Sequence, residues 1–314
     1  MTAPQDRTAP QNAELEAAGV DVEEGRVPFR GHHTWYRRLT PTDTDRLPVV
    51  VIHGGPGSAS EYLAVLDRLV DHGYPVVRYD QLGCGRSERP DDPALWVADT
   101  FTAELDAVRE HLGLEQVHLL GHSWGGMLAM EHAAAHPDTV AGVVLASAPA
   151  SVPRISRETR EMVALLPADT RAVIASHEAA GTTDDPAYES AVRTFDQRHI
   201  CRLDPYPEVL SDRSLHGDQV YATMCGPSEF TIIGRLRTWD FTDRLGEVRQ
   251  PTLVTGGRYD EFTPGHAGAM LQRLPDARYV CFEDSAHCAH LEEPIAFRTV
   301  VAGFLDEVEA ARTV

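Results

Sequence analysis

Gln116-Val-His-Leu-Leu-Gly-His-Ser-Trp-Gly-Gly-Met127 is the stretch from which the fold can be predicted. Residues 116–120 form a short, largely apolar run that is typical of a buried strand. Residues 123–136 favour a helix, which has to stop before Pro137. Between the two, glycines stand two residues before and two residues after Ser123, so the chain can make a sharp strand-to-helix turn. Such a turn exposes its serine, and we predict that Ser123 is a nucleophile; a plain tight turn is the alternative.

The same alternation of strand and helix extends outward on both sides of this turn. Strands are predicted at residues 48–53, 75–79, 116–120, 140–146, 251–255 and 277–282, and helices at 60–70, 100–112, 123–136, 264–274 and 294–311. Apolar strands that are separated by amphipathic helices pair in parallel and are covered on both faces. We therefore predict an α/β fold class with a mostly parallel sheet and helices on both of its faces.

The alternation breaks in the middle of the chain. Between about residues 150 and 240 the sequence is charged, has a helical pattern and contains few strand-like runs. We expect residues 1–149 and 240–314 to form the α/β core, and residues 150–239 to form a helical cap inserted into it. Residues 1–25 are rich in Ala, Pro, Gln and acidic side chains, and we expect them to fray or to wrap the surface.

The chain of 314 residues carries a formal net charge of −20. This charge would repel phosphate backbones and anionic lipid, so neither nucleic acid nor a membrane is an expected partner. Five cysteines, an odd number without a C-x-x-C pair, argue against a disulfide framework. The first residues lack the basic start and the apolar run of a signal peptide. We expect a cytoplasmic protein with free thiols, and the sequence carries no signal for its oligomeric state.

A nucleophilic serine needs a histidine as its base, and that histidine needs an acid to orient it. In folds with this serine turn, the three residues follow one another in the order serine, acid, histidine. Asp260 comes soon after the predicted strand at 251–255, and His287 comes soon after the one at 277–282. The carboxyl ends of parallel strands meet at one edge of the sheet. We therefore predict that Ser123, Asp260 and His287 form a catalytic triad.

Other acids and histidines fit these roles less well. His122 flanks the nucleophile and should point away from it, while His290 is expected to be a surface or structural residue. Asp284 lies close to the base but does not follow an earlier strand. Asp80, in the turn after residues 75–79, comes too early in the chain to be the triad acid, and we interpret that turn as structural support for the site.

The glycine-rich turn His53-Gly-Gly-Pro-Gly57 follows the first predicted strand. A backbone amide in this turn can form an oxyanion hole together with the amide of Trp124. We favour the amide of Gly55 and keep Gly54 as the alternative. The turn lacks the G-x-G-x-x-G and P-loop spacings that bind nucleotides. The ligand types in His287-Cys288-Ala289-His290 and His32-His33 lack zinc-site spacing, so we expect no metal and no cofactor.

A resemblance to a known family rests on three motifs: His53-Gly-Gly-Pro-Gly57, Asp80-Gln-Leu-Gly-Cys-Gly-Arg-Ser87 and Gly121-His-Ser-Trp-Gly-Gly-Met127. Together they are similar to those of the proline iminopeptidase (prolyl aminopeptidase) family of α/β-hydrolase serine peptidases. The similarity extends from about residue 30 to 300. It implies an α/β-hydrolase fold with a helical cap. It also implies cleavage of one residue, often proline, from the free amino terminus of a small peptide or aminoacyl substrate.

The resemblance also implies how the substrate is held. In that family two glutamates bind the substrate's amino group, and the matching positions here are Glu229 and Glu261. Without the resemblance, both would be interpreted as solvated surface acids. The chain departs from the family at Cys225, where the family commonly has Asn. This departure concerns the preference for proline rather than hydrolysis itself.

Two other functions use the same residues differently. An esterase, lactonase or acyltransferase would have the same triad without a requirement for a free amine. A non-catalytic binding protein would use the pocket as a receptor, although the intact set of triad residues argues against it. Dehalogenases and epoxide hydrolases of this fold need a carboxylate as nucleophile, which Ser123 excludes.

Overall fold

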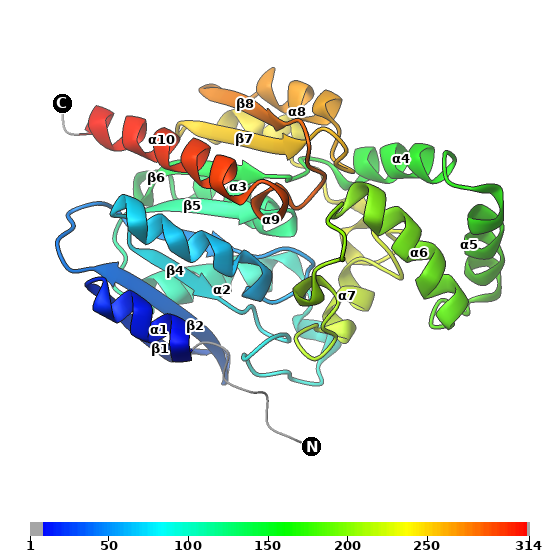
Figure 1. The fold of residues 1–314 in the computed structure, drawn as a ribbon, viewed down its shortest axis with the longest axis horizontal. Coiled ribbons are helices and arrows are strands. Elements are labelled where there is room, and N and C mark those ends of the chain that lie inside the picture. Colours follow the sequence, from blue (N-terminus) through cyan, green and yellow to red (C-terminus); the bar gives the residue numbers. More distant parts are fainter. Residues whose placement is uncertain (1–8, 313–314) are drawn as a thin grey trace.

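The computed structural model describes residues 9–312 and has an eight-stranded sheet at its centre (Figure 1). The strands lie in the order β1-β2-β4-β3-β5-β6-β7-β8. The six strands from β4 to β8 in this order are parallel to one another, and β2 and β1 add an antiparallel edge. The strands are β1 (Val20–Phe29), β2 (His32–Pro41), β3 (Val49–Ile52), β4 (Val76–Tyr79), β5 (Val117–His122), β6 (Val140–Ala146), β7 (Thr252–Gly257) and β8 (Ala277–Phe282).

Helices cover both faces of this sheet because its strands are apolar on both sides. In β3, Val50 and Ile52 face one hydrophobic cluster, while Val49 and Val51 face the other. The first cluster is covered by α2 (Ala98–His111), α3 (Trp124–Ala135) and α8 (Pro264–Leu271). The second is covered by the 3-10 helix η1 (Glu61–His72), α1 (Ala9–Ala17), α9 (Ala289–Glu292) and α10 (Pro294–Arg312). The predicted α/β fold class is therefore confirmed, and each of the six predicted strands is present.

The start of the chain differs from the expectation that residues 1–25 fray or wrap the surface. Residues 1–8 lie outside the described part, but α1 and β1 account for most of residues 9–29. Strand β1 pairs with β2 along its whole length across a tight turn at Arg30 and Gly31, which both have positive φ, 49° and 82°. Most side chains of β1 are exposed or half-buried, so its charged sequence lacks the apolar run by which the other strands were predicted.

A mostly helical segment joins β6 to β7 and lies beyond one end of the sheet (Figure 1). It contains α4 (Val152–Val163), α5 (Ala168–Ala180), α6 (Pro186–His199) and α7 (Asp218–Met224), with shorter 3-10 turns between them. Part of it packs around a small hydrophobic cluster of its own, which includes Phe195 and Phe230. The division into a core and a cap stays a prediction. None of the helices among residues 9–312 combines the length and the apolarity of a membrane span.

Candidate active site

Ser123 occupies a sharp turn between β5 and α3. Its backbone angles, φ 55° and ψ −123°, are strained for a residue with a side chain. A Cβ on Gly121 would lie 2.3 Å from the carbonyl oxygen of Gly125, and a Cβ on Gly125 would lie 2.1 Å from that of Ile52. Only glycine fits at either position, which explains the spacing seen in the sequence. The turn places Ser123 at the edge of the sheet where the parallel strands end.

Asp260 and His287 lie in contact at the same edge, in the loops that follow β7 and β8. The ring nitrogen Nδ1 of His287 is 3.0 Å from Oδ1 of Asp260, and both side chains are buried. The same oxygen accepts a hydrogen bond of 3.0 Å from the backbone N–H of Phe262. Because a carboxylate can only accept, Nδ1 of His287 donates, which leaves the lone pair of Nε2 free to act as a base.

Ser123 lies near the pair formed by Asp260 and His287 but is not hydrogen-bonded to it. His122, its neighbour in the chain, has its ring centroid 4.6 Å from that of His287. Among the described residues, no hydrogen bond joins the side chains of Ser123 and His287; such bonds commonly tighten only when substrate is bound. The structure thus joins Asp260 to His287 and brings the serine turn alongside them. The triad as a whole stays a prediction.

The backbone around Gly54 and Gly55 has a defined orientation. The N–H of Gly54 already donates to the hydroxyl of Tyr62 at 2.8 Å, so it is not free to bind an oxyanion. The carbonyl of Gly54 is 2.8 Å from Nδ1 of His53. Across a trans peptide the N–H points away from the preceding carbonyl, so the amide of Gly55 points away from His53. Gly55 lines the same cavity as Ser123, which favours Gly55 over Gly54 as the oxyanion donor.

Trp124 is the first residue of α3, where backbone amides have no partner within the helix. Its indole N–H donates to the side chain of Gln81 at 2.9 Å. Gln81 in turn donates from its side chain to the carbonyl of His53 and from its backbone to Nε2 of His53, both at 2.9 Å. The turn after β4 therefore connects the two loops from which oxyanion donors are predicted. Sequence reasoning did not single out Gln81, and no spacing rule would have found it.

A cavity opens beside Ser123. Glu229 and Glu261 stand in its lining together with Cys225. The remaining side chains of the lining are nearly all apolar: Trp124, Met127, Pro149, Val152, Ile155, Ile232, Leu236 and Phe262. The two predicted glutamates thus share an apolar cavity with the predicted nucleophile.

Burial in this cavity disfavours the charged forms of both glutamates. Burial raises the pKa of Glu229, although a hydrogen bond of 2.8 Å from the hydroxyl of Tyr221 and the nearby His287 act in the opposite direction. Glu261 is 2% exposed and its Oε2 has no hydrogen-bond partner. Burial and the charges of Glu229 and Asp260 raise its pKa well above the usual range. A cation bound between the carboxylates would relieve this cost of burial.

Asp196 of α6 is a third acidic group near this cavity, and sequence reasoning missed it. Burial raises its pKa to about 7; Arg193 acts to lower the pKa, and the charge of Glu229 acts to raise it. It also contributes to the raised pKa of Glu261. No motif marks Asp196, because its place near the glutamates depends on how α6 packs.

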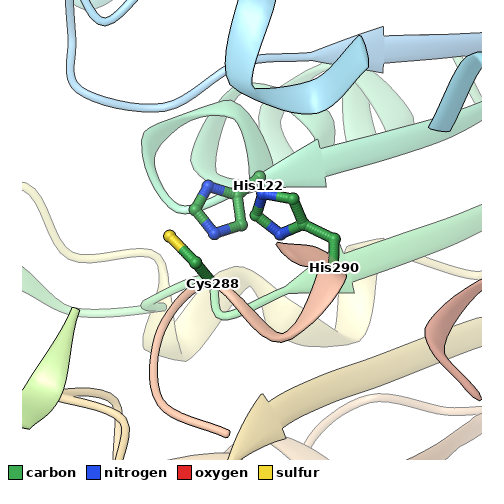
Figure 2. Close-up of side chains that lie close together, drawn as sticks. All are labelled: His122, Cys288 and His290. Atoms are coloured by element: carbon green, nitrogen blue, oxygen red, sulfur yellow. The ribbon is translucent and has the colours of Figure 1, made fainter. Parts of the chain in front are cut away.

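Two groups of side chains in the described part of the chain bring together metal-ligand types. His122, Cys288 and His290 lie close together, with one ligand atom of each within 4.8 Å of the others (Figure 2). Both ring nitrogens of His122 already have partners: Nδ1 lies 2.8 Å from the hydroxyl of Tyr62, and Nε2 lies 3.0 Å from the carbonyl of His287. A metal would have to displace one of them, so these side chains fit a structural role better.

The second group consists of Asp106, His132 and His136. Arg109 donates to Nε2 of His132 at 3.0 Å, so in the neutral ring Nδ1 carries the hydrogen. Oδ1 of Asp106 lies 3.4 Å from Nδ1, and no hydrogen bond forms between them. Nδ1 therefore offers no lone pair to a metal in this arrangement.

Comparison with known proteins places the chain in a family. The alpha/beta hydrolase fold family matches residues 48–294. Proline iminopeptidase of Lactobacillus helveticus is 36% identical over 292 residues, which cover 92% of this chain and 99% of that protein. The chain belongs to the proline iminopeptidase family of α/β hydrolases. The resemblance inferred from the three motifs is thereby confirmed, and the chain is a hydrolase.

Two solved structures superpose closely on this chain. The crystal structure of proline iminopeptidase from Mycobacterium smegmatis matches with a TM-score of 0.85 and 40% identity, over 92% of this chain and all of that one. The crystal structure of VinJ matches with a TM-score of 0.88 and 41% identity, over 91% of this chain and 99% of that one. Both matches extend through the helical segment between β6 and β7, because they cover more than nine-tenths of the chain.

Proposed function

We propose that this member of the proline iminopeptidase family is a serine hydrolase that removes the first residue from a peptide or amino-acid amide with a free amino group. The observation that carries the proposal is the pair of glutamates, Glu229 and Glu261, in an otherwise apolar cavity beside Ser123. The relatives named proline iminopeptidase support the same substrate class.

The chemistry proceeds through an acyl-enzyme. His287 takes the proton of the Ser123 hydroxyl as its oxygen attacks the carbonyl carbon of the first residue, and Asp260 keeps the imidazole in the required tautomer. The amides of Gly55 and Trp124 stabilise the negative oxygen of the tetrahedral intermediate. His287 then gives its proton to the leaving amine as the C–N bond breaks. A water molecule, deprotonated by the same imidazole, releases the amino acid.

The glutamates select for a free amino terminus. A carboxylate and an ammonium group 4 Å apart attract each other by roughly 4 kcal/mol at an effective dielectric constant near 20, before the cost of desolvation. An N-acylated substrate carries no such charge and leaves both carboxylates without a cation. The cavity therefore binds amines in preference to neutral groups of the same size.

The rest of the cavity selects the side chain of that first residue. Its lining offers apolar surface and no charged group besides the glutamates. Proline and small apolar residues match such a lining, whereas a charged side chain would be desolvated without a partner. Cys225 lies within this lining, with its sulfur 3.8 Å from the carbonyl of Gly55.

Rates for matched pairs of substrates test the proposal. The p-nitroanilides of proline and alanine should be cleaved with a kcat/KM at least about 100-fold above that of their N-acetyl forms. A fluorophosphonate probe, which needs no amine, should label the protein and so report whether the serine is reactive. Labelling together with equal rates on free and acetylated substrates would instead indicate an esterase, lactonase or acyltransferase. Absence of labelling would indicate a binding protein.

A further inference from the structure

A chain of buried hydrogen bonds runs behind the site and is not required by the proposed chemistry. The N–H of Gly54 lies 2.8 Å from the hydroxyl oxygen of Tyr62, and that oxygen lies 2.8 Å from Nδ1 of His122. Nε2 of His122 lies 3.0 Å from the carbonyl oxygen of His287. We call these four residues the Tyr62 relay. It joins the oxyanion turn, the serine turn and the loop of the base.

The direction of each hydrogen bond in the Tyr62 relay follows from the chemistry of its ends. A carbonyl can only accept, so Nε2 of His122 donates to His287. Burial, together with His287 and His290, holds the pKa of His122 well below its usual value, so its ring is neutral and has a single N–H. Nδ1 is then an acceptor and must receive the hydrogen of Tyr62. The hydroxyl oxygen in turn accepts from Gly54, whose N–H can only donate.

Each internal member of the relay is therefore used both as donor and as acceptor, in one order only. A second set of bonds fixes the other side of the base loop. The N–H of His287 donates to the carbonyl of His199 at 3.2 Å, and the N–H of Cys288 donates to that of Ile200 at 2.9 Å. The His287 backbone is thus held at its amide by the helical segment and at its carbonyl by His122.

We propose that Tyr62 and His122 are positioning residues, which hold the backbone of the base and the oxyanion turn at a fixed separation from Ser123. Neither side chain touches the substrate. His122 lies directly next to the nucleophile in the chain, so its bond to His287 sets the distance between the serine turn and the base loop. Through its bonds to His122 and Gly54, Tyr62 also fixes the position of Gly54, and hence that of the neighbouring amide of Gly55. The inference rests on the proposed triad.

Loss of the relay should lower kcat strongly and should change KM little. A displacement of about 1 Å between catalytic groups can cost as much as 100-fold in rate. The amine-binding glutamates and the apolar lining are not members of the relay, so KM should change little. Substitution of a residue that only stabilises the fold would lower the melting temperature and leave kcat per folded molecule unchanged.

Tyr62→Phe removes one hydroxyl and keeps the ring. We expect kcat on alanine p-nitroanilide to fall roughly 10-fold or more, with KM within about 2-fold of the wild-type value. The rate of labelling by a fluorophosphonate should fall in parallel, because it depends on the serine and its base. Tyr74→Phe is the matched control: it removes another buried hydroxyl, which donates to Asp306 at 2.9 Å. It should change the melting temperature and leave kcat unaltered.

Two substitutions of His122 separate position from packing. His122→Gln keeps an N–H donor near the place of Nε2, whereas His122→Met fills a similar volume without one. We expect His122→Met to lose roughly 10- to 100-fold in kcat, and His122→Gln to recover most of that loss. Circular dichroism and thermal melting report whether each variant is folded.

The outcomes that would overturn the proposal differ from those that would overturn the function. If Tyr62→Phe and His122→Met are folded and keep wild-type kcat and labelling rates, the relay has no positioning role, whatever the substrate is. Equal rates for His122→Gln and His122→Met would also contradict it. Failure of the wild-type protein to react with the fluorophosphonate would instead contradict the proposed nucleophile.

Discussion

The two sides of Ser123 differ in how their polar groups are satisfied. On the side away from the cavity, the polar groups of the Tyr62 relay have hydrogen-bond partners within the protein. On the cavity side, Oε2 of Glu261 is buried and has none. Folding alone favours partnered groups, because an unpaired buried oxygen costs about 1 to 3 kcal/mol. We interpret the relay as part of the scaffold and Glu261 as a group placed to bind a ligand, because Glu261 lines the cavity.

One carboxylate outside the cavity shows the limit of this comparison. Glu104 of α2 is fully buried, its Oε1 accepts hydrogen bonds from Thr34 and from the N–H of Leu82, and its Oε2 has no partner. Burial raises its pKa to about 8, and the hydrogen bonds from Thr34 and Leu82 offset only part of this rise. Glu104 therefore avoids a buried negative charge by keeping its proton at neutral pH. A missing partner marks a binding group only where a cavity adjoins it.

The largest effect on activity is expected for Ser123, which lies between the relay and the cavity. Ser123→Ala should lower kcat at least about 1000-fold, because the acyl-enzyme cannot form. Steady-state hydrolysis of aminoacyl p-nitroanilides measures this, and fluorophosphonate labelling should be abolished. The melting temperature should change little. Activity retained at the wild-type level would refute Ser123 as the nucleophile.

The cavity side is tested by Glu261→Gln, which removes one charge from the predicted amine site. We expect kcat/KM for alanine p-nitroanilide to fall roughly 10- to 100-fold, since a charged hydrogen bond contributes about 1.5 to 3 kcal/mol. Turnover of an N-acetylated substrate should hardly change. Glu283→Gln, in an exposed ion pair with Arg258, is the control and should have wild-type rates on both substrates. An equal loss on both substrates would argue that Glu261 does not bind the amine.

Glu104→Gln should alter stability and leave turnover unchanged. The unfolded chain releases the Glu104 proton near its ordinary pKa of 4.5, whereas the folded chain holds it until about pH 8. The stability that this group contributes is therefore fully present below pH 4.5 and is lost as the pH rises through 8. Glutamine has no proton to lose. The free energy of unfolding of the variant should therefore rise relative to that of the wild type as the pH rises, by at most about 5 kcal/mol.

Urea unfolding at pH 5 and at pH 8.5 measures that gain as a difference in the free energy of unfolding between variant and wild type. The difference should be small at the lower pH and favour Glu104→Gln at the higher one. A difference of the same size at both values would show that the carboxyl does not keep its proton in the folded chain.

Cys225→Asn is expected to have the smallest effect. It introduces the residue that the family resemblance leads us to expect at this position of the cavity. We expect the ratio of kcat/KM for proline and alanine p-nitroanilides to change by about 2- to 10-fold, since small changes in a pocket contribute about 1 kcal/mol. Cys201→Asn, at a buried thiol outside the cavity lining, is the control. An unchanged ratio would mean that Cys225 does not set side-chain preference.

Local patterns in the sequence were enough to predict the parallel part of the sheet. The strands β3 to β8 are short apolar runs, and each is followed by a turn or helix with its own signal. The edge strand β1 was missed because its sequence, Val20-Asp-Val-Glu-Glu-Gly-Arg-Val-Pro-Phe29, alternates too weakly and carries charge. The approach of Asp260 to His287 could be predicted because both follow neighbouring parallel strands, whose ends must lie together.

The sequence by itself determined the order of the six parallel strands along the chain, the sharp serine turn and the residue types at the carboxyl edge. These features depend on hydrophobic periodicity and on glycine, which act over a few residues. The tertiary structure alone decided that Tyr62 contacts His122, 60 residues away, and that His122 contacts the carbonyl of His287, 165 residues away. The direction and partner of a buried hydrogen bond depend on how distant segments pack, and no spacing along the chain records that.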